Sequence, residues 1–191
     1  MSTRSRTRGR FAFVVLAGWL AVPLSAFGDG AVTPVTGRKL TLKSSLTNSL
    51  RKSMTIVARD PAITVGTNGS GDDPTVHGGG VTLLSPAFGL YYNMPVEHWS
   101  LVGSAGENKG YRYRSSANFE EIRSAVVKNG VIKVRARSAL LGHVLFPDPN
   151  PVDVVVNSGA QQHCMRFGGT VAFTTGVSYV ATDAPPPDAC P

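Results

Sequence analysis

The chain has 191 residues, with 19 Lys and Arg against 12 Asp and Glu, which gives a formal net charge of +7. A chain of this length fits one domain that buries a sizeable core without help from a disulfide. Its two cysteines are too few for a structural zinc site, which needs four ligands.

The first 28 residues have the three-part pattern of a cleavable secretory signal peptide. An apolar run over residues 11–24 follows a stretch that holds no acid and four arginines: Arg4, Arg6, Arg8 and Arg10. The run is about 14 residues long, short of the ~20 that a membrane-spanning helix needs, so we expect no transmembrane anchor after processing. Cleavage is expected after Gly28, with cleavage after Ala26 as the alternative.

Cleavage changes the charge of the working protein. Four basic residues and no acid leave with the leader, so 15 basic and 12 acidic residues remain and the mature charge is +3. We therefore predict two parts, a signal peptide over residues 1–28 and a single β-rich domain over residues 29–191. The mature protein is expected in the periplasm or outside the cell.

Turn residues divide the mature chain into short, strand-like runs. The predicted strands cover residues 39–43, 53–58, 81–84, 98–102, 111–114, 122–128, 131–138, 152–156, 170–174 and 177–181. Many short strands at this spacing predict an all-β fold, an antiparallel β-sandwich or barrel-like domain with little helix. Short helical turns are expected only near residues 45–52 and 118–122.

Residues 66–80 are rich in Gly, Asp and Thr and predict a long surface loop. Asn68, Ser70, Asp72 and Asp73 place oxygen ligands in this loop, but the sequence lacks the Glu that an EF-hand calcium loop requires at its twelfth position. One interpretation is a looser calcium site that uses Asn68, Asp72 and Asp73. The other is a turn in which these side chains bond their own backbone. No other cofactor is expected.

The histidines do not show the spacing of a zinc helix. His77 begins a His-Gly-Gly-Gly run that matches the oxyanion loop of esterases, but the chain has no G-x-S-x-G nucleophile motif to accompany it. We expect His77, His98, His143 and His163 to be ordinary surface or hydrogen-bonded residues. A hydrolase site assembled from distant residues stays open, with His77, His98 and the pair at 72–73 as its first candidates.

Three aromatic residues in the middle of the chain have two interpretations. Tyr91, Tyr92 and Trp99 offer flat rings that could stack on a sugar. The same rings would also serve as part of the core, and we favour that interpretation.

The clearest hairpin surrounds an Asn-Gly pair at residues 129–130, which suits a two-residue type I′ turn. This turn sets a register in which Val127 faces Ile132 and Ala125 faces Val134. These four side chains would form an inward apolar face. The outward face would then carry three basic residues: Lys133, Arg135 and Arg137.

The strand predicted at residues 111–114 alternates Tyr with Arg. Tyr111 and Tyr113 therefore share one face, and Arg112 and Arg114 share the other. If this strand neighbours the second strand of the hairpin, the basic residues form a stripe that could bind an anionic polysaccharide or envelope lipid. The candidate ligand-binding residues are Trp99, Tyr111, Arg112, Tyr113, Arg114, Lys133, Arg135 and Arg137. An ordinary solvated sheet face is the alternative, and no specific nucleic-acid binding is expected.

Cys164 and Cys190 are the only cysteines. An even number of cysteines in an exported chain favours a disulfide. The bridge would hold the Pro-rich tail at residues 185–187 against the body of the domain.

Several short motifs lie along most of the mature chain. They are Asp73-Pro74-Thr75, Gly78 to Gly80, Met94-Pro95, Trp99, Lys109-Gly110-Tyr111-Arg112-Tyr113, Pro151-Val152 and Cys164. In these motifs the chain resembles a loosely defined group of exported bacterial proteins that have no assigned activity. Arg114-Ser115 departs from the Asp expected soon after the paired tyrosines. The resemblance implies export and a β-rich body, and it implies no chemistry.

Two hypotheses follow for the function. The first, which we favour, is an exported non-catalytic β-sandwich that acts as a cell-envelope, adhesion or carbohydrate-binding module. The second is an exported hydrolase. An enzyme should bring a His together with a carboxylate or a nucleophile in one cleft, whereas a binding module need not.

Overall fold

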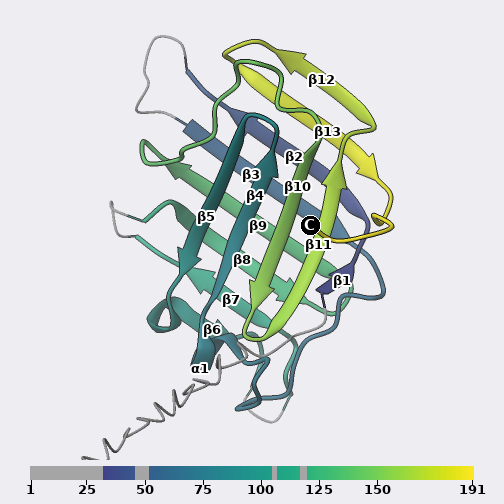
Figure 1. Ribbon diagram of the computed structural model, residues 1–191. Coiled ribbons are helices and arrows are strands. Elements are labelled where there is room, and N and C mark those ends of the chain that lie inside the picture. The colour runs from purple at the N-terminus through teal and green to yellow at the C-terminus, as the bar shows by residue number, and fades with distance from the viewer. Residues whose placement is uncertain (1–31, 46–51, 105–106, 117–119) are drawn as a thin grey trace, which may run out of the picture.

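The computed structural model describes residues 32–45, 52–104, 107–116 and 120–191. The predicted signal peptide at residues 1–28 lies outside these ranges. The described residues form two β-sheets packed face to face, which confirms the all-β sandwich prediction (Figure 1). Helix is limited to α1 (Pro74–His77) and the 3-10 turn η1 (Val96–His98) in these ranges. None of the described helices has the length and apolar character needed to cross a membrane.

The smaller sheet has five strands and the larger sheet has eight. The smaller sheet runs in the order β1 (Val32–Pro34), β11 (Gln161–Phe167), β10 (Val152–Ser158), β4 (Gly79–Ser85) and β5 (Phe88–Met94). The larger sheet runs in the order β12 (Thr170–Thr174), β13 (Ser178–Ala184), β2 (Gly37–Lys43), β3 (Lys52–Arg59), β9 (Val131–Ser138), β8 (Ile122–Lys128), β7 (Tyr111–Arg114) and β6 (Trp99–Leu101). Neighbouring strands pair antiparallel, except that β1 pairs parallel with β11.

All ten predicted strands are present. The bounds of β7, β8, β9 and β12 match the prediction, and six other strands differ by a few residues at their ends. The sequence prediction missed β1, β5 and β11.

The two expected helical turns and the expected loop at residues 66–80 differ from the structure or lie partly outside the described residues. The helical turn expected at residues 118–122 is wrong where it can be judged, since Ile122 begins β8. The turn expected at residues 45–52 falls mainly outside the described residues, and Lys52 begins β3. The segment at residues 66–80 is not wholly a loop, because it contains α1 and the first residues of β4.

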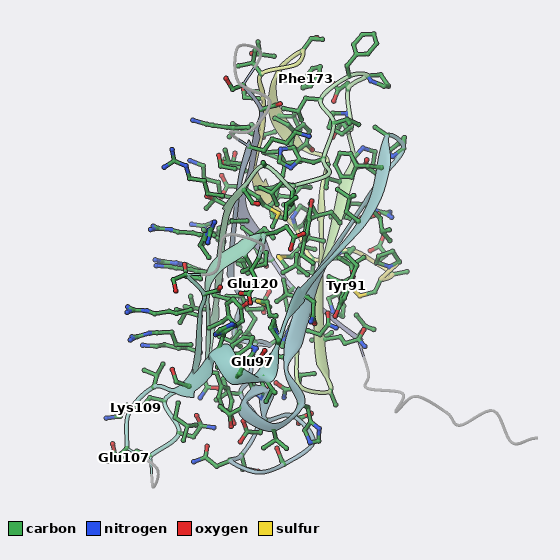
Figure 2. The ribbon with its side chains drawn as sticks, turned by 90° about the vertical axis from the view of Figure 1, so that its left-hand side faces the viewer. Tyr91, Glu97, Glu107, Lys109, Glu120 and Phe173 are labelled. Carbon is green, nitrogen blue, oxygen red and sulfur yellow. A yellow bond between two sulfur atoms is a disulfide. The ribbon has the colours of Figure 1, made fainter. Side chains whose placement is uncertain are left out.

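The core fills the space between the sheets with the inward side chains of both (Figure 2). The β8–β9 hairpin has the predicted register, with Val127 opposite Ile132 and Ala125 opposite Val134. All four of these side chains are buried. Since successive residues of a strand point to opposite faces, this register turns the intervening residues to the outside of the larger sheet.

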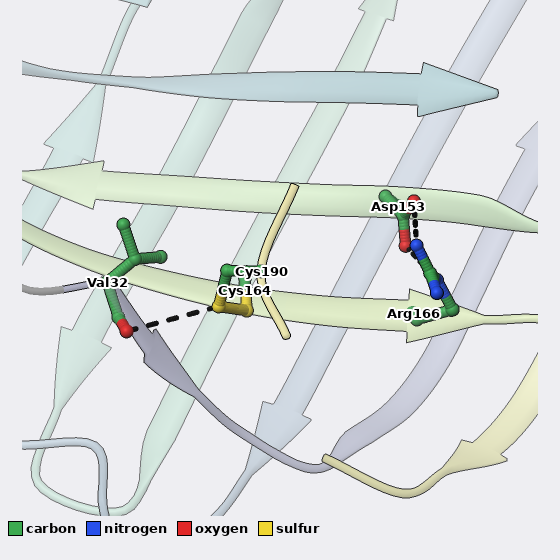
Figure 3. Close-up of a disulfide and its surroundings, with 5 residues drawn as sticks. All are labelled: Val32, Asp153, Cys164, Arg166 and Cys190. Atoms are coloured by element: carbon green, nitrogen blue, oxygen red, sulfur yellow. Dashed lines mark hydrogen bonds and ion pairs between the residues drawn. A yellow bond between two sulfur atoms is a disulfide. The ribbon is translucent and has the colours of Figure 1, made fainter. Parts of the chain in front are cut away.

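Cys164 and Cys190 form the predicted disulfide, with their Cα atoms 5.8 Å apart (Figure 3). Cys164 lies on β11 of the smaller sheet, and Cys190 lies in the C-terminal segment. Arg166, two residues further along β11, donates hydrogen bonds to both carboxylate oxygens of Asp153 on β10, at 2.7 and 3.0 Å. Because the disulfide joins Cys190 to a strand of the smaller sheet, it holds the C-terminal tail over that sheet (Figure 1).

Removing the bridge should destabilise the domain. In the chain-entropy model a loop of this sequence separation, 26 residues, contributes roughly 3 kcal/mol. We expect the Cys164→Ala/Cys190→Ala variant to unfold in urea with a free energy lower by about that amount. Intact mass with and without reductant, after alkylation, would establish that the wild-type bridge is formed. An unchanged unfolding midpoint would show that the bridge does not stabilise the fold.

Candidate functional site

The outer side of the larger sheet is strongly basic. Its outward positions on β2, β3, β9, β8 and β7 follow from the register of these strands. The basic residues at those positions, which we call the basic face, are Lys39, Lys43, Arg59, Arg112, Arg114, Lys128, Lys133, Arg135 and Arg137. No outward position of these five strands, as the structure describes them, carries Asp or Glu. Long side chains with nitrogen at their ends project from this side of the molecule (Figure 2).

The strand register spaces the charges of the basic face. Lys133 lies between Val57 of β3 and Val126 of β8, and Val126 lies opposite Arg112 of β7. Strands lie about 4.8 Å apart, so Lys133 and Arg112 are separated by roughly 10 Å at the backbone. Like charges are destabilising when they are directly opposite, and the interposed valine avoids that arrangement.

The next row of the sheet repeats this alternation. Arg135 pairs with Thr55 on one side and Ser124 on the other, and Ser124 pairs with Arg114. The side chains of both rows surround a shallow hollow of about 240 Å³ lined by Arg112, Arg114, Ser124, Val126, Lys133 and Arg135. Four basic side chains therefore converge around one open depression with small or apolar residues at its floor.

The predicted stripe differs from the observed basic face in one respect. The prediction rested on the strand at 111–114 lying beside β9, but β8 lies between them. The predicted basic residues still share one face, because β8 pairs each outward residue of β7 with an outward residue of β9 across it. These residues are Arg112, Arg114, Lys133, Arg135 and Arg137. With the basic residues of β2, β3 and β8 beside them, these residues form a broad face over five strands instead of a narrow stripe.

The aromatic residues of the predicted ligand site lie in the core. Trp99, Tyr111 and Tyr113 point into the core and are almost completely buried. The Tyr111 hydroxyl donates to the carbonyl of Gly66 at 3.0 Å, and the Trp99 Nε1–H donates to the carbonyl of Met94 at 3.1 Å. Buried Tyr and Trp need such partners for their polar atoms, so these rings serve the fold. Of the three rings considered for sugar stacking, Tyr91 alone is exposed.

Among the described residues, His98 and Glu120 make a direct His–carboxylate contact. His98 Nε2 lies 2.9 Å from Glu120 Oε1, while the Tyr113 hydroxyl donates to Glu120 Oε2 at 2.8 Å. Burial works to raise the pKa of Glu120, but hydrogen bonds from Ser115 and Tyr113 and the nearby His98 outweigh it and lower this pKa. Burial and the bond to Glu120 together raise the pKa of Tyr113.

This cluster does not have the order of a hydrolase site. A nucleophilic triad places the His between the hydroxyl and the acid, so that the His can take the proton of the nucleophile. Here Glu120 is in the middle and accepts from His98, Ser115 and Tyr113. The Glu120 carboxylate therefore links the segment before β8 to Tyr113 of β7 and to His98 of η1, and His98 has a structural role in these contacts.

The other three histidines lie in different surroundings. His143 and His163 are buried, and burial lowers the pKa of both. His163 lines a hollow together with Asp72. His77 is exposed at the end of α1. The structure does not bring His98 to Asp72 or Asp73 by any contact among the described residues.

The structure places the proposed calcium ligands Asn68, Asp72 and Asp73 in different surroundings. Asp73 is buried, and its Oδ2 accepts from the Gly69 N–H at 2.7 Å. Its Oδ1 accepts from the Thr75 N–H at 2.8 Å and from the Thr75 hydroxyl at 2.6 Å, which caps α1. Asn68 is exposed, and Asp72 lines the hollow beside His163. Within the described ranges, no three His, Cys, Asp or Glu residues gather as a metal group.

The Asp73 cap should make stability depend on pH. Burial works to raise the pKa of Asp73, but the hydrogen bonds from Gly69 and Thr75 outweigh it and hold the pKa below 3.8. The contribution is therefore present above the unfolded pKa, near 4, and is lost as the pH falls through the folded value. We expect Asp73→Asn to lower the free energy of unfolding by about 1 to 2 kcal/mol at pH 7, because an amide N–H₂ then faces a donor.

The difference between wild type and Asp73→Asn should shrink as the pH is lowered from about 5 to about 3. Urea unfolding at a series of pH values measures it. Asp188→Asn, an exposed carboxylate in the tail, is the matched control and should stay close to wild type throughout. A difference that does not change with pH would contradict the assignment of Asp73 as an ionised cap.

Comparisons with known proteins give no relative to which the chain can be assigned. No protein-family model matches the chain, and no match is found among curated proteins or solved structures. A function for this chain must therefore be inferred from its own residues and their geometry.

Proposed function

We propose that this protein is an exported, non-catalytic β-sandwich module that binds an anionic polysaccharide of the cell envelope through the basic face. The observation that carries the proposal is the shared outward direction of the basic residues on five neighbouring strands, with no carboxylate among the described outward positions. The hollow between Arg112, Lys133 and Arg135 would receive one acidic group of the polymer.

Electrostatics favours an extended anionic polymer as the partner. Cations of one sign, set on a low-dielectric core, sum to a positive potential over the whole face. The charges lie roughly 10 Å apart across the sheet, which is about one Debye length at 0.1 M salt. Each acidic unit of a polymer would therefore meet a cation without needing a deep pocket.

Two other anionic partners are less well supported. Peripheral membrane binding usually adds apolar side chains that enter the bilayer. The outward positions of β2, β3, β7, β8 and β9 carry no exposed large apolar residue among those described. Their apolar residues are the half-buried Val57, Val126 and Val131. Single-stranded nucleic acid is usually bound by stacking on aromatic rings. Tyr111 and Tyr113, which alternate with Arg112 and Arg114 on β7, are in the core.

Export is part of the proposal. The residues before the described domain have the pattern of a signal peptide, and the disulfide between Cys164 and Cys190 suits an oxidising compartment. The resemblance to exported bacterial proteins in the motifs around Trp99 and Tyr111 points the same way. An envelope polysaccharide is a partner that such a protein would meet in the periplasm or outside the cell.

The Arg112→Gln/Lys133→Gln variant should bind an acidic polysaccharide such as immobilised polygalacturonate roughly three- to tenfold more weakly than wild type, since each exposed ion pair contributes up to about 1 kcal/mol. Surface plasmon resonance at low salt measures the dissociation constant. Wild-type binding should also weaken as salt is raised, because the pairs are exposed and screened.

The control variant is Lys109→Gln/Arg166→Gln, which removes the same charge from positions outside the basic face. It should stay within about twofold of wild type. Equal losses in both variants would show a response to net charge alone and would overturn the proposal. Tighter binding to anionic vesicles or to DNA than to the polysaccharide, measured in parallel, would assign a different partner.

A further inference from the structure

A second hollow lies on the outer side of the smaller sheet, away from the basic face. Figure 2 shows Tyr91 on the side of the molecule opposite the nitrogen-tipped side chains of the larger sheet. The hollow has a volume of about 320 Å³ and includes Tyr91, Asn93, Asn157 and His77 among its lining residues. We call it the amide hollow. This volume is near the lower end of the range for small-molecule sites, about 300 to 1,000 Å³.

Tyr91 is held in an exposed position by the backbone beneath it. Its side chain is 58% exposed, although it lies in the middle of β5. The end of its ring rests against Gly80 of β4, where any β-carbon would lie 2.6 Å from the Tyr91 hydroxyl oxygen. Gly80 therefore leaves the space that the ring uses, and a ring placed in this way presents apolar area to solvent.

Two amides flank the same glycine. The register places Asn93 of β5 opposite Gly80, and Gly80 opposite Asn157 of β10. Both side chains point outward, because their neighbours Tyr92, Met94 and Val156 are buried. Neither amide makes a side-chain hydrogen bond to another described residue. Each amide offers two N–H donors and one acceptor oxygen, so their hydrogen-bonding capacity is available to a ligand.

The lining has the chemistry of a site for an uncharged, hydroxylated ligand. Among the described residues that line the amide hollow there is no Asp, Glu, Lys or Arg, and His77 is the one histidine. Amides that both donate and accept suit neighbouring hydroxyl groups, and an exposed ring suits the C–H face of a sugar ring. Apart from His77, a charged ligand would find no ionisable partner among the described lining residues.

We propose that the amide hollow is a binding site for an uncharged sugar unit, which stacks on Tyr91 and accepts and donates hydrogen bonds at Asn93 and Asn157. This site is separate from the basic face and does not depend on the proposed function. Its ligand class also differs, since the basic face recognises acidic groups and the amide hollow recognises hydroxyl groups.

The experiment uses NMR titration of the purified protein with neutral probes: the methyl glycosides of glucose, galactose and mannose, and N-acetylglucosamine. Shifts should concentrate on the backbone and side-chain amides of Asn93 and Asn157, with millimolar affinity for at least one sugar. Tyr91→Ala should weaken that binding about tenfold, while Tyr91→Phe should retain most of it. Gly80→Ala should also weaken it, because the new methyl group displaces the ring.

Phe146→Ala is the matched control, since Phe146 is another exposed aromatic residue, 76% exposed, outside the amide hollow. It should bind the sugar as wild type does. No shift with any of the four sugars, or an equal loss in Phe146→Ala and Tyr91→Ala, would overturn this inference. The Arg112→Gln/Lys133→Gln variant should bind the sugar normally, so the failure of one proposal can be distinguished from the failure of the other.

Discussion

The alternation of side chains along the strands, held in one register across the larger sheet, is the constraint on which the rest of this structure depends. A slip of one residue would move every apolar side chain of a strand to solvent and every cation into the core. The Asn129-Gly130 turn fixes the β8–β9 pairing. The predicted type I′ turn is wrong, because that type needs a positive φ at both central residues, and Gly130 has one (75°) whereas Asn129 does not. The same pairing thus produces a buried face with Val127 and Ile132 and an outer face with Lys133 and Arg135.

The strands that could be predicted from the sequence are those whose own alternation of apolar and polar residues defines them. β7, β8 and β9 alternate cleanly and end at turn residues, so their bounds follow from the sequence. The strands that were missed depend on their neighbours. β5 contains Gly89 and Asn93, which are poor strand formers, and β11 begins with two glutamines and buries His163. β11 is a strand because β1 and β10 pair with it on both sides, and local sequence does not record that pairing.

The candidate site could be predicted only in part, for the same reason. Parity within one strand places Arg112 and Arg114 opposite the tyrosines of β7, and the structure has that arrangement. The sequence could not show that β8 lies between β7 and β9, because strand order depends on the packing of the whole domain. It also could not identify the amide hollow. Asn93, Gly80 and Asn157 come from three strands, and their meeting depends on a pairing that begins with the unpredicted β5.

The charges of the basic face also oppose contact between two copies of the sandwich through the larger sheet. A broad sheet face with Val57, Val126 and Val131 among its outward residues would offer an apolar surface to a second copy if its neighbours were small and neutral. Cations on either side of each valine oppose that contact, because stacking two such faces would bring like charges together in a region with little water. The residues that would attract an acidic polymer therefore also repel another copy of the chain. A bound polyanion would neutralise the cations of the basic face while leaving much of that face in contact with water, which a second copy of the chain would not do.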